Sequence, residues 1–329
     1  THTNGCSLFP VGGFAVLRAN SSDPDALAVN VAYGPYGSGH DHPDRLSMTV
    51  HALGQIVCPD AGSWGYENPM HLTWANQSVA HNTISVDEMA QEPQVRSKGI
   101  WAAERGDQRV SGVLRLFHSG PHLKAVRTTC DTAYPGTRLD RTVCLVGDYL
   151  MDVFRVSADA EHVFDLPLHG RGDATTDGDV ETFKESPFTG LGYTHFENVR
   201  RVRTGPGIVR ATFCAEERRL QVLQVLPTDS ELFLARDPVR DKDTTSCLLA
   251  RCRGRQATFI TLLVPSRNEG TRHGLTMERH EGEIRVEIAH PRGTDHIVFP
   301  ESLAGGISLE QLDTAGSTIA RDSSTGPRK

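Results

Sequence analysis

The chain has 329 residues, of which 38% are hydrophobic, 6% aromatic and 23% charged. This composition is typical of a globular protein and excludes collagen, a coiled coil or a wholly disordered chain. The formal net charge is −7 and no block of five like charges occurs, so we expect no nucleic-acid partner and no membrane partner.

The first residues, 1–5, contain neither a basic start nor an apolar stretch, so we predict no signal peptide here and interpret the chain as part of something longer. No run of about 18 apolar residues indicates a membrane span. The seven cysteines are odd in number, scattered and without a Cys-x-x-Cys pair. This pattern favours buried thiols over a zinc ribbon or a disulfide framework.

Short apolar or alternating segments, separated by turn residues, recur along the chain and predict strands. In residues 46–52 the apolar side chains fall on alternate positions, as in a half-buried strand. Helical periodicity is nearly absent, with residues 308–312 as a weak helix candidate. We predict an all-β fold, a multi-sheet antiparallel β-sandwich over residues 1–314, followed by a disordered tail at 315–329. The predicted strands include residues 14–17, 27–33, 46–52, 110–117, 149–156, 220–226, 258–264, 284–288 and 296–299.

Residues 33–91 are unusually rich in glycine, histidine and aromatic residues. A glycine-rich run leads into His40 and His42, whose spacing would place both side chains on one face of a strand. A turn at Gly54 would bring Asp60 back beside the start of that strand. Two imidazoles and one carboxylate form a common zinc shell. Taken singly, these residues are explained equally well as surface histidines and an aspartate in a turn. Only their occurrence together in this stretch favours a metal site.

Two ordered motifs in this stretch resemble the heparinase II/III-like polysaccharide lyases. The first, residues 34–47, reads Gly-Pro-Tyr-Gly-Ser-Gly-His-Asp-His-Pro-Asp-Arg-Leu-Ser. The second begins with Gly-Ser-Trp-Gly-Tyr at residues 62–66 and is most similar to the oligoalginate-lyase branch, which is related to exolytic glycosaminoglycan lyases. It continues with Pro69, His71, Trp74 and residues 81–83.

The resemblance implies a β-sandwich domain that follows an N-terminal α/α toroid, with the active site between the two. We expect that toroid, as a domain or a separate chain, to be a partner that lies outside this sequence and is needed for activity. By position, His40 matches a catalytic histidine and Tyr66 a tyrosine at the cleft. His42, Asp60 and His81 match the ligands of a structural zinc ion. The resemblance also favours a periplasmic or cell-envelope location, with the cytoplasm as the alternative.

The sequence departs from the family pattern at two places. Asp41 stands between the two histidines, where a small residue is usual, and Cys-Pro-Asp-Ala at residues 58–61 replaces a more typical apolar-Asp-Pro/Leu-Gly sequence. The catalytic tyrosine of the toroid, with its asparagine or histidine, has no counterpart here. These departures put part of the implied active site in doubt.

The implied reaction is β-elimination at a uronic acid of an anionic polysaccharide or oligosaccharide, such as alginate or the glycosaminoglycans heparin and heparan. The reaction needs a group that neutralises the carboxylate, a base for the carbon-5 proton and an acid for the leaving oxygen. We expect His40 and Tyr66 to act there and zinc to be structural. His71 and Trp74 could line a sugar subsite and Arg200 could attract the substrate. Core packing of Trp74 and a solvated strand face for Arg200 explain these two residues equally well.

Three alternatives remain open from the residues. A cupin-like metalloenzyme fits Gly34, His40 and His42, but it needs a glutamate where Leu46 and Ser47 stand. A non-catalytic carbohydrate-binding β-sandwich would account for the missing half of the active site. A zinc hydrolase would use the same His/Asp/His shell for catalysis instead of structure.

Overall fold

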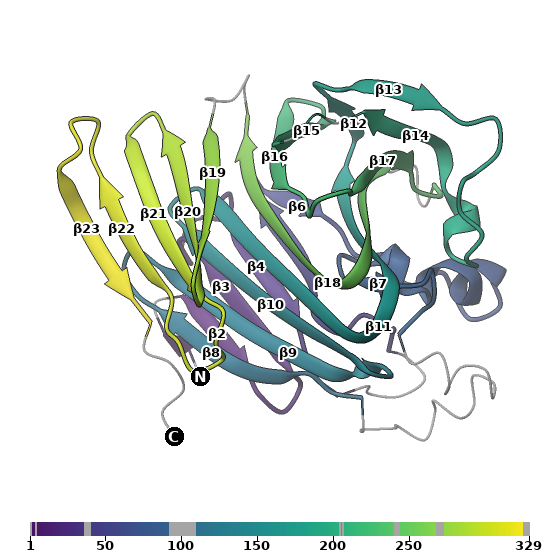
Figure 1. Ribbon diagram of the computed structural model, residues 1–329, viewed down its shortest axis with the longest axis horizontal. Helices are drawn as coiled ribbons and strands as arrows, with labels where there is room; N and C mark the ends of the chain where they lie inside the picture. Colours follow the sequence, from purple (N-terminus) through teal and green to yellow (C-terminus); the bar gives the residue numbers. More distant parts are fainter. Residues whose placement is uncertain are drawn as a thin grey trace.

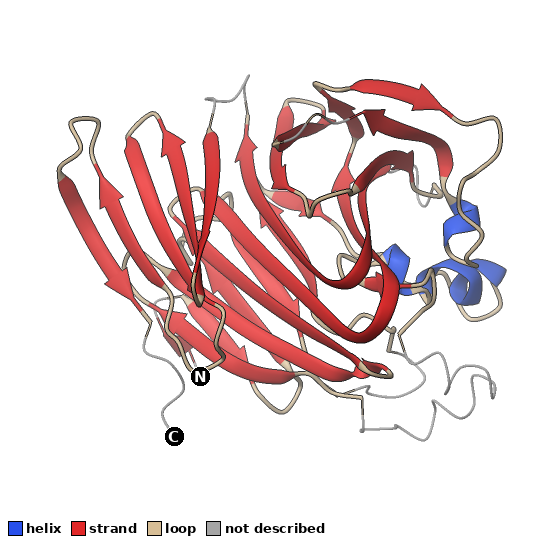
Figure 2. Ribbon diagram, viewed as in Figure 1, coloured by secondary structure: helices blue, strands red, loops and turns tan. Residues whose placement is uncertain are grey.

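The computed structural model describes residues 2–3, 5–35, 41–91, 110–203, 205, 207–239, 244–267 and 273–324. Strands dominate, as Figure 2 shows by colour. Every pair of strands among the described residues is antiparallel. The all-β sandwich that the sequence predicts is therefore confirmed. No helix among the described residues has both the length and the apolar character to cross a membrane.

The first sheet is a meander in which each strand pairs with the next along the chain. Its last hairpin turns at Leu53 and Gly54, which both have positive φ values, as a tight two-residue hairpin requires. The turn that the sequence predicts at Gly54 is confirmed. The strands are β1 (His2–Thr3), β2 (Cys6–Phe9), β3 (Phe14–Arg18), β4 (Ala28–Ala32), β5 (Ser47–Ala52) and β6 (Gln55–Cys58).

The second sheet is the largest and lies in the middle of the molecule (Figure 1). Two long strands, β11 (Tyr149–Arg171) and β18 (Thr245–Ser266), pair along most of their length and connect its two ends. The other strands are β7 (Ser85–Val86), β8 (Val113–Ser119), β9 (Lys124–Tyr134), β10 (Thr137–Val146), β12 (Asp173–Thr176), β13 (Asp179–Thr182), β14 (Glu197–Arg203), β15 (Ile208–Ala215), β16 (Arg218–Val225) and β17 (Glu231–Arg236).

A third sheet forms the C-terminal part of the described chain and is again a meander. Its strands are β19 (Gly274–His280), β20 (Glu283–His290), β21 (Gly293–Pro300), β22 (Ser308–Leu312) and β23 (Thr318–Ser323). Three short helical turns complete the described elements: the π-helical η1 (His71–Ala75) and the 3-10 turns η2 (Ser78–Ala80) and η3 (Tyr193–His195).

The central sheet is buried on both faces, which explains why the start of β11 is apolar at every position except Asp152. Leu150 and Phe154 belong to the core shared with the first sheet, whereas Met151 and Val153 belong to the core shared with the third sheet. Alternate side chains of a strand point to opposite faces, so a strand between two sheets is apolar on both faces. A third, smaller core joins η1 and η2 to β17 and β18.

Two sequence predictions near the C-terminus differ from the structure. Residues 308–312, the weak helix candidate, form strand β22, and Thr318–Ser323, expected in a disordered tail from residue 315, form strand β23. Strand β23 lies at the edge of the sheet and is held by backbone pairing with β22 and by an ion pair between Arg321 and Glu310. Its side chains are mostly exposed, so composition gives little sign of it. Residues 325–329 lie outside the described residues.

Glycines at the start of the first motif serve a close contact between two backbone segments. The N–H groups of Tyr33 and Gly34 donate to the Gly13 carbonyl at 2.7 and 3.0 Å. Gly13 has a φ of +68°, and a Cβ added to it would lie 1.8 Å from the Gly34 Cα. Tyr33 and Gly34 are thus fixed against the β2–β3 turn.

We expect Gly13→Ala to be much more destabilising than a matched change at Gly282, whose φ is +78° but whose added Cβ would meet nothing within 4 Å. Gly282→Ala should cost about 1 kcal/mol, the penalty of a left-handed backbone for an L-residue. Gly13→Ala should cost about 1–3 kcal/mol more because of the clash. Urea unfolding of both variants measures the difference, and equal losses would contradict the contact.

Candidate functional site

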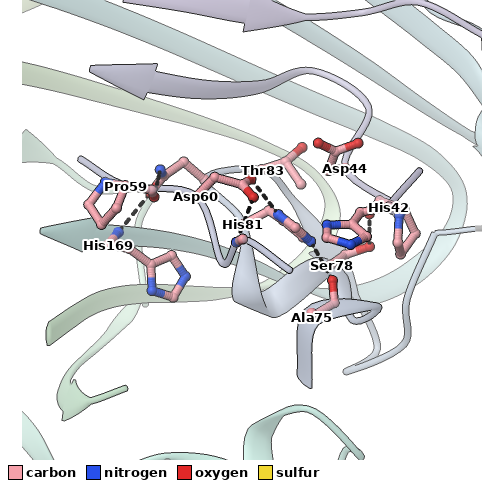
Figure 3. Close-up of polar contacts among 12 residues, drawn as sticks. His42, Asp44, Pro59, Asp60, Ala75, Ser78, His81, Thr83 and His169 are labelled. Atoms are coloured by element: carbon pink, nitrogen blue, oxygen red, sulfur yellow. Dashed lines mark hydrogen bonds and ion pairs between the residues drawn. The ribbon is translucent and has the colours of Figure 1, made fainter. Parts of the chain in front are cut away.

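Three side chains from separate loops converge beside the first sheet (Figure 3). His42 precedes β5, Asp60 follows β6, and His81 follows η2. One potential ligand atom from each lies within 4.8 Å of the others. The β5–β6 hairpin brings Asp60 back beside His42, as the turn at Gly54 predicts. His42 itself lies in a loop rather than on the strand that its spacing to His40 suggested.

His81 is the fully buried member of this cluster. Its Nε2 lies 2.9 Å from the Ala75 carbonyl oxygen, and its Nδ1 lies 2.7 Å from Asp60 Oδ2. Both neighbours are acceptors, so both ring nitrogens donate in the metal-free protein. Burial alone would lower the pKa of His81, but the charge of Asp60 and its hydrogen bond outweigh this and raise it to about 9. The same interaction holds the pKa of the Asp60 carboxyl, whose side chain is 34% exposed, below its usual range.

His42 is half-buried and lies against the ring of His81, with the two ring centroids 5.1 Å apart. Burial, together with the positive charge of His81, lowers the pKa of His42 to about 4. A neutral imidazole has a lone pair on one ring nitrogen. His42 is therefore in the protonation state that a metal ligand or a general base requires.

Aromatic rings extend this cluster toward the surface. The centroid of His71 lies 6.3 Å from that of His42 and 4.8 Å from that of Tyr66. His71 is buried in η1 and its Nε2 lies 3.2 Å from Asn76 Nδ2, whereas Tyr66 is 60% exposed. These contacts form a row of rings, the ring row, that leads from solvent to the interior. It consists of four residues predicted from the sequence: Tyr66, His71, His42 and His81.

Three other predicted site residues have different positions. Trp74 is buried in η1 and packs edge-on against Phe196, with ring centroids 5.5 Å apart. Arg200 is half-buried on β14, which pairs with β13 and β17 instead of with the strands beside His42. His40, the predicted catalytic histidine, lies outside the described residues.

A network of buried polar groups fixes the loop that carries His42. The backbone N–H of Arg45 donates to Gln91 Oε1 at 2.7 Å, and Gln91 Nε2 donates back to the Arg45 carbonyl at 3.0 Å. The Ser78 hydroxyl donates to the Pro43 carbonyl at 2.6 Å. The loop is not paired with a strand, so these hydrogen bonds satisfy its buried backbone groups instead. A single sequence gives no signal for them, because they become neighbours only in the fold.

Arg141 connects the central sheet to two of the loops that form the site. Its guanidinium is 1% exposed and forms a bidentate pair with Asp152 at 2.9 and 2.8 Å. Its Nη1 donates to the carbonyls of Leu46 and Asn82, which follow His42 and His81 in the sequence. Asn82 in turn donates through Nδ2 to the Met48 and Pro59 carbonyls. The sequence predicts no site role for Arg141 or Asp152, and Asn82 belongs to the second motif without a predicted role.

A cavity of about 340 Å³ opens beside the cluster. Asp60 forms part of its wall, and Trp64 and Trp74 provide its aromatic lining. His169 and Arg171 of β11 form the opposite side. The cavity therefore combines a carboxylate, two aromatic side chains and a cation, which is a mixed polar and apolar surface of the kind that small-molecule sites use.

Comparison with known proteins identifies the family of the chain. Residues 1–294 match the model of the heparinase II/III-like C-terminal domain. The chain belongs to the heparinase II/III-like family. This membership confirms the resemblance seen in the two motifs and removes the cupin alternative.

Among curated proteins, the heparinase II/III-like chain is similar to an alginate lyase of Stenotrophomonas maltophilia, with 29% identity over 93% of this chain and 43% of the relative. It is also similar to an exo-oligoalginate lyase of Saccharophagus degradans, with 26% identity over 70% of this chain and 34% of the relative. The chain thus spans less than half the length of these two relatives.

Among solved structures, the heparan sulfate lyase HepC of Pedobacter heparinus superimposes with a TM-score of 0.64 at 15% identity, covering 90% of this chain and 42% of that one. A heparinase III structure gives a TM-score of 0.63 at 15% identity over 91% and 43% of the two chains. At this identity the similarity establishes the sandwich fold.

We expect Arg141→Met to loosen the site loops as well as destabilise the heparinase II/III-like domain. Removing the guanidinium leaves Asp152 buried and unpaired, which costs about 3–5 kcal/mol. It also frees the Leu46 and Asn82 carbonyls, so amide hydrogen exchange at residues 81–83 should accelerate beyond what the global loss explains.

Arg127→Met is the matched control, because Arg127 forms a similarly buried bidentate pair with Asp140 and donates to the Ser302 carbonyl, away from these loops. It should lower the free energy of unfolding without a specific effect at residues 81–83. Identical exchange patterns in the two variants would contradict the role of Arg141.

Proposed function

We propose that this chain is the sheet-domain part of a polysaccharide lyase that cleaves a uronic-acid-containing anionic polysaccharide by β-elimination. The match of residues 1–294 to the heparinase II/III-like C-terminal domain carries this proposal. We favour alginate oligosaccharides as the substrate, because the curated relatives named alginate lyases are 29% and 26% identical, whereas the heparan sulfate lyase is 15% identical. An α/α toroid outside this sequence would provide the rest of the cleft.

The chemistry assigns roles to His40 and to Tyr66, the residue at the surface end of the ring row. His40 takes the carbon-5 proton or neutralises the uronate carboxylate, and Tyr66 assists by a hydrogen bond or by proton transfer to the leaving oxygen. In support, Tyr66 is 60% exposed and its ring contacts His71. Its phenol is therefore accessible to a substrate while its ring is held in place. Such an enzyme would meet its substrate in the periplasm or cell envelope.

We further propose that His42, Asp60 and His81 hold a structural zinc ion. The donor set fits this ion: two imidazoles and one carboxylate with ligand atoms within 4.8 Å of one another. The Ala75 carbonyl accepts the Nε2 proton of His81, the usual way in which a protein fixes a histidine so that Nδ1 faces the metal. Zinc would supply positive charge and cross-link the three loops, and the proton transfers would belong to His40 and Tyr66.

The lyase proposal is tested by the absorbance of unsaturated products when the full-length protein acts on a panel of uronate polysaccharides. We expect alginate oligosaccharides to give the highest rate. His40→Ala should lower turnover by about 10²–10⁴-fold, the usual contribution of a general acid or base. Tyr66→Phe, which keeps the ring beside His71 and removes the hydroxyl, should also lower it.

His280→Ala is the matched control, since His280 is a solvent-exposed histidine of β19 that pairs with Glu278. It should retain the wild-type rate. Binding of uronate polysaccharides with no unsaturated product on any of them would favour a non-catalytic carbohydrate-binding module. A normal rate in His40→Ala would remove the catalytic assignment of that residue.

For zinc, we expect His42→Ala to contain one zinc ion per chain fewer than the wild type. Adding zinc to the chelated wild type should raise its melting temperature, because a ligand at 100 times its Kd stabilises the folded state by about 2.7 kcal/mol. The rise should be smaller in His42→Ala. Metal analysis and thermal melts check both points. Loss of turnover on chelation with an unchanged melting temperature would instead favour a zinc hydrolase.

A further inference from the structure

A second cluster of metal-binding residue types lies at the cavity that Asp60 also lines. His169 of β11 pairs directly with Cys247 of β18 in the strand register. Residues opposite each other in an antiparallel pair point to the same face, with Cβ atoms about 4.5–5.5 Å apart. Cys247 also pairs with Ala235 of β17, and Asp237 follows that strand. One potential ligand atom from each of His169, Asp237 and Cys247 lies within 4.8 Å of the others.

The cluster is removed from bulk water. Relative exposures are 2% for His169, 5% for Asp237 and 0% for Cys247. Asp237 Oδ2 lies 2.8 Å from His169 Nδ1, but its Oδ1 is buried with no hydrogen-bond partner among the described residues. A buried carboxylate oxygen without a partner is costly and calls for a specific explanation.

His169 is held in the same way as His81. Its Nε2 lies 2.9 Å from the Val79 carbonyl, just as the Nε2 of His81 lies 2.9 Å from the Ala75 carbonyl. In both residues Nδ1 faces an aspartate carboxylate. A carbonyl that accepts the Nε2 proton orients the ring so that Nδ1 is the ligand atom. The two histidine–aspartate pairs differ in their third neighbour, which is His42 in one and Cys247 in the other.

We propose that His169, Asp237 and Cys247 form a second metal site, which binds zinc or a similar divalent transition metal. Thiolate and imidazole ligands select such ions over magnesium and calcium, which require oxygen ligands. Zinc bonds of about 2.0–2.3 Å place tetrahedral ligand atoms roughly 3.3–3.8 Å apart. The clustered atoms reach that spacing by small movements, and the His169–Asp237 pair opens as the metal enters.

A metal ion binds His169 and Cys247 through a nitrogen lone pair and a thiolate, so binding releases the protons at these atoms to solvent. A divalent ion balances the charges of one thiolate and one carboxylate. The cavity of about 340 Å³, whose walls include His169 and Asp237, provides the entry path and room for water as a fourth ligand.

Cobalt titration tests this site separately from the one at His42. The apo protein, prepared with a chelator and kept reduced, is titrated with Co²⁺ alone. Thiolate coordination gives an intense near-ultraviolet charge-transfer band that a His/Asp/His site cannot give. We expect this band to appear in the wild type and to saturate at one equivalent of the thiolate-bound ion.

Cys247→Ala should abolish the band, whereas Cys144→Ala, which removes an equally buried thiol of β10, should retain it. Asp237→Asn keeps the side-chain shape and should weaken cobalt binding at this site by at least tenfold. It serves as the second variant if Cys247→Ala fails to fold. His42→Ala should leave the band unchanged, so failure of the proposed structural zinc would not affect this result.

Two results would overturn the proposal. One is the absence of a thiolate band in folded, reduced wild type at saturating cobalt, whether or not cobalt binds at His42. The other is a band of full amplitude that survives Cys247→Ala.

Discussion

The fold and the candidate site depend on one buried ion pair. Arg141 of β10 and Asp152 of β11 are diagonal neighbours on two paired strands of the central sheet. The remaining donor of the guanidinium is shared by the Leu46 and Asn82 carbonyls. Leu46 has a φ of +63°, a left-handed conformation that a leucine adopts at a cost. The hydrogen bond from the charged, buried guanidinium of Arg141 to the Leu46 carbonyl compensates for that cost. A hydrophobic pair in place of Arg141 and Asp152 could stabilise the core equally well, but it could not position the two loops.

Asn82 extends this constraint from the first cluster to the second. Its Nδ2 donates to the Pro59 carbonyl next to Asp60, and its Oδ1 accepts the backbone N–H of His169 at 2.7 Å. One side chain, adjacent in sequence to His81, therefore connects both histidine–aspartate pairs. Because Asn82 is fully buried, each of its hydrogen bonds replaces one with water, and a substitution would leave several buried groups unpaired.

The sequence predicts the features that local patterns encode. Alternation predicts β5, the turn at Gly54 places Asp60 beside His42, and the ordered motifs identify the family. The edge strand β23 is missed, because its side chains are exposed and only backbone pairing with β22 defines it. The second cluster is also missed: His169 and Cys247 are 78 residues apart, and only the β11–β18 register makes them neighbours. The register of two strands so far apart along the chain cannot be deduced from a single sequence.

The ends of the two short helices explain why both histidines share one geometry. A helix leaves its last carbonyl groups without intrahelical donors, and a buried carbonyl needs another partner. Ala75, the last residue of η1, and Val79 of η2 both present such carbonyls, and His81 and His169 satisfy them. The same hydrogen bond that completes the helix end turns Nδ1 of each ring toward an aspartate. The backbone carbonyl thus holds the Nε2 proton of each ring, and Nδ1 is the nitrogen left for chemistry.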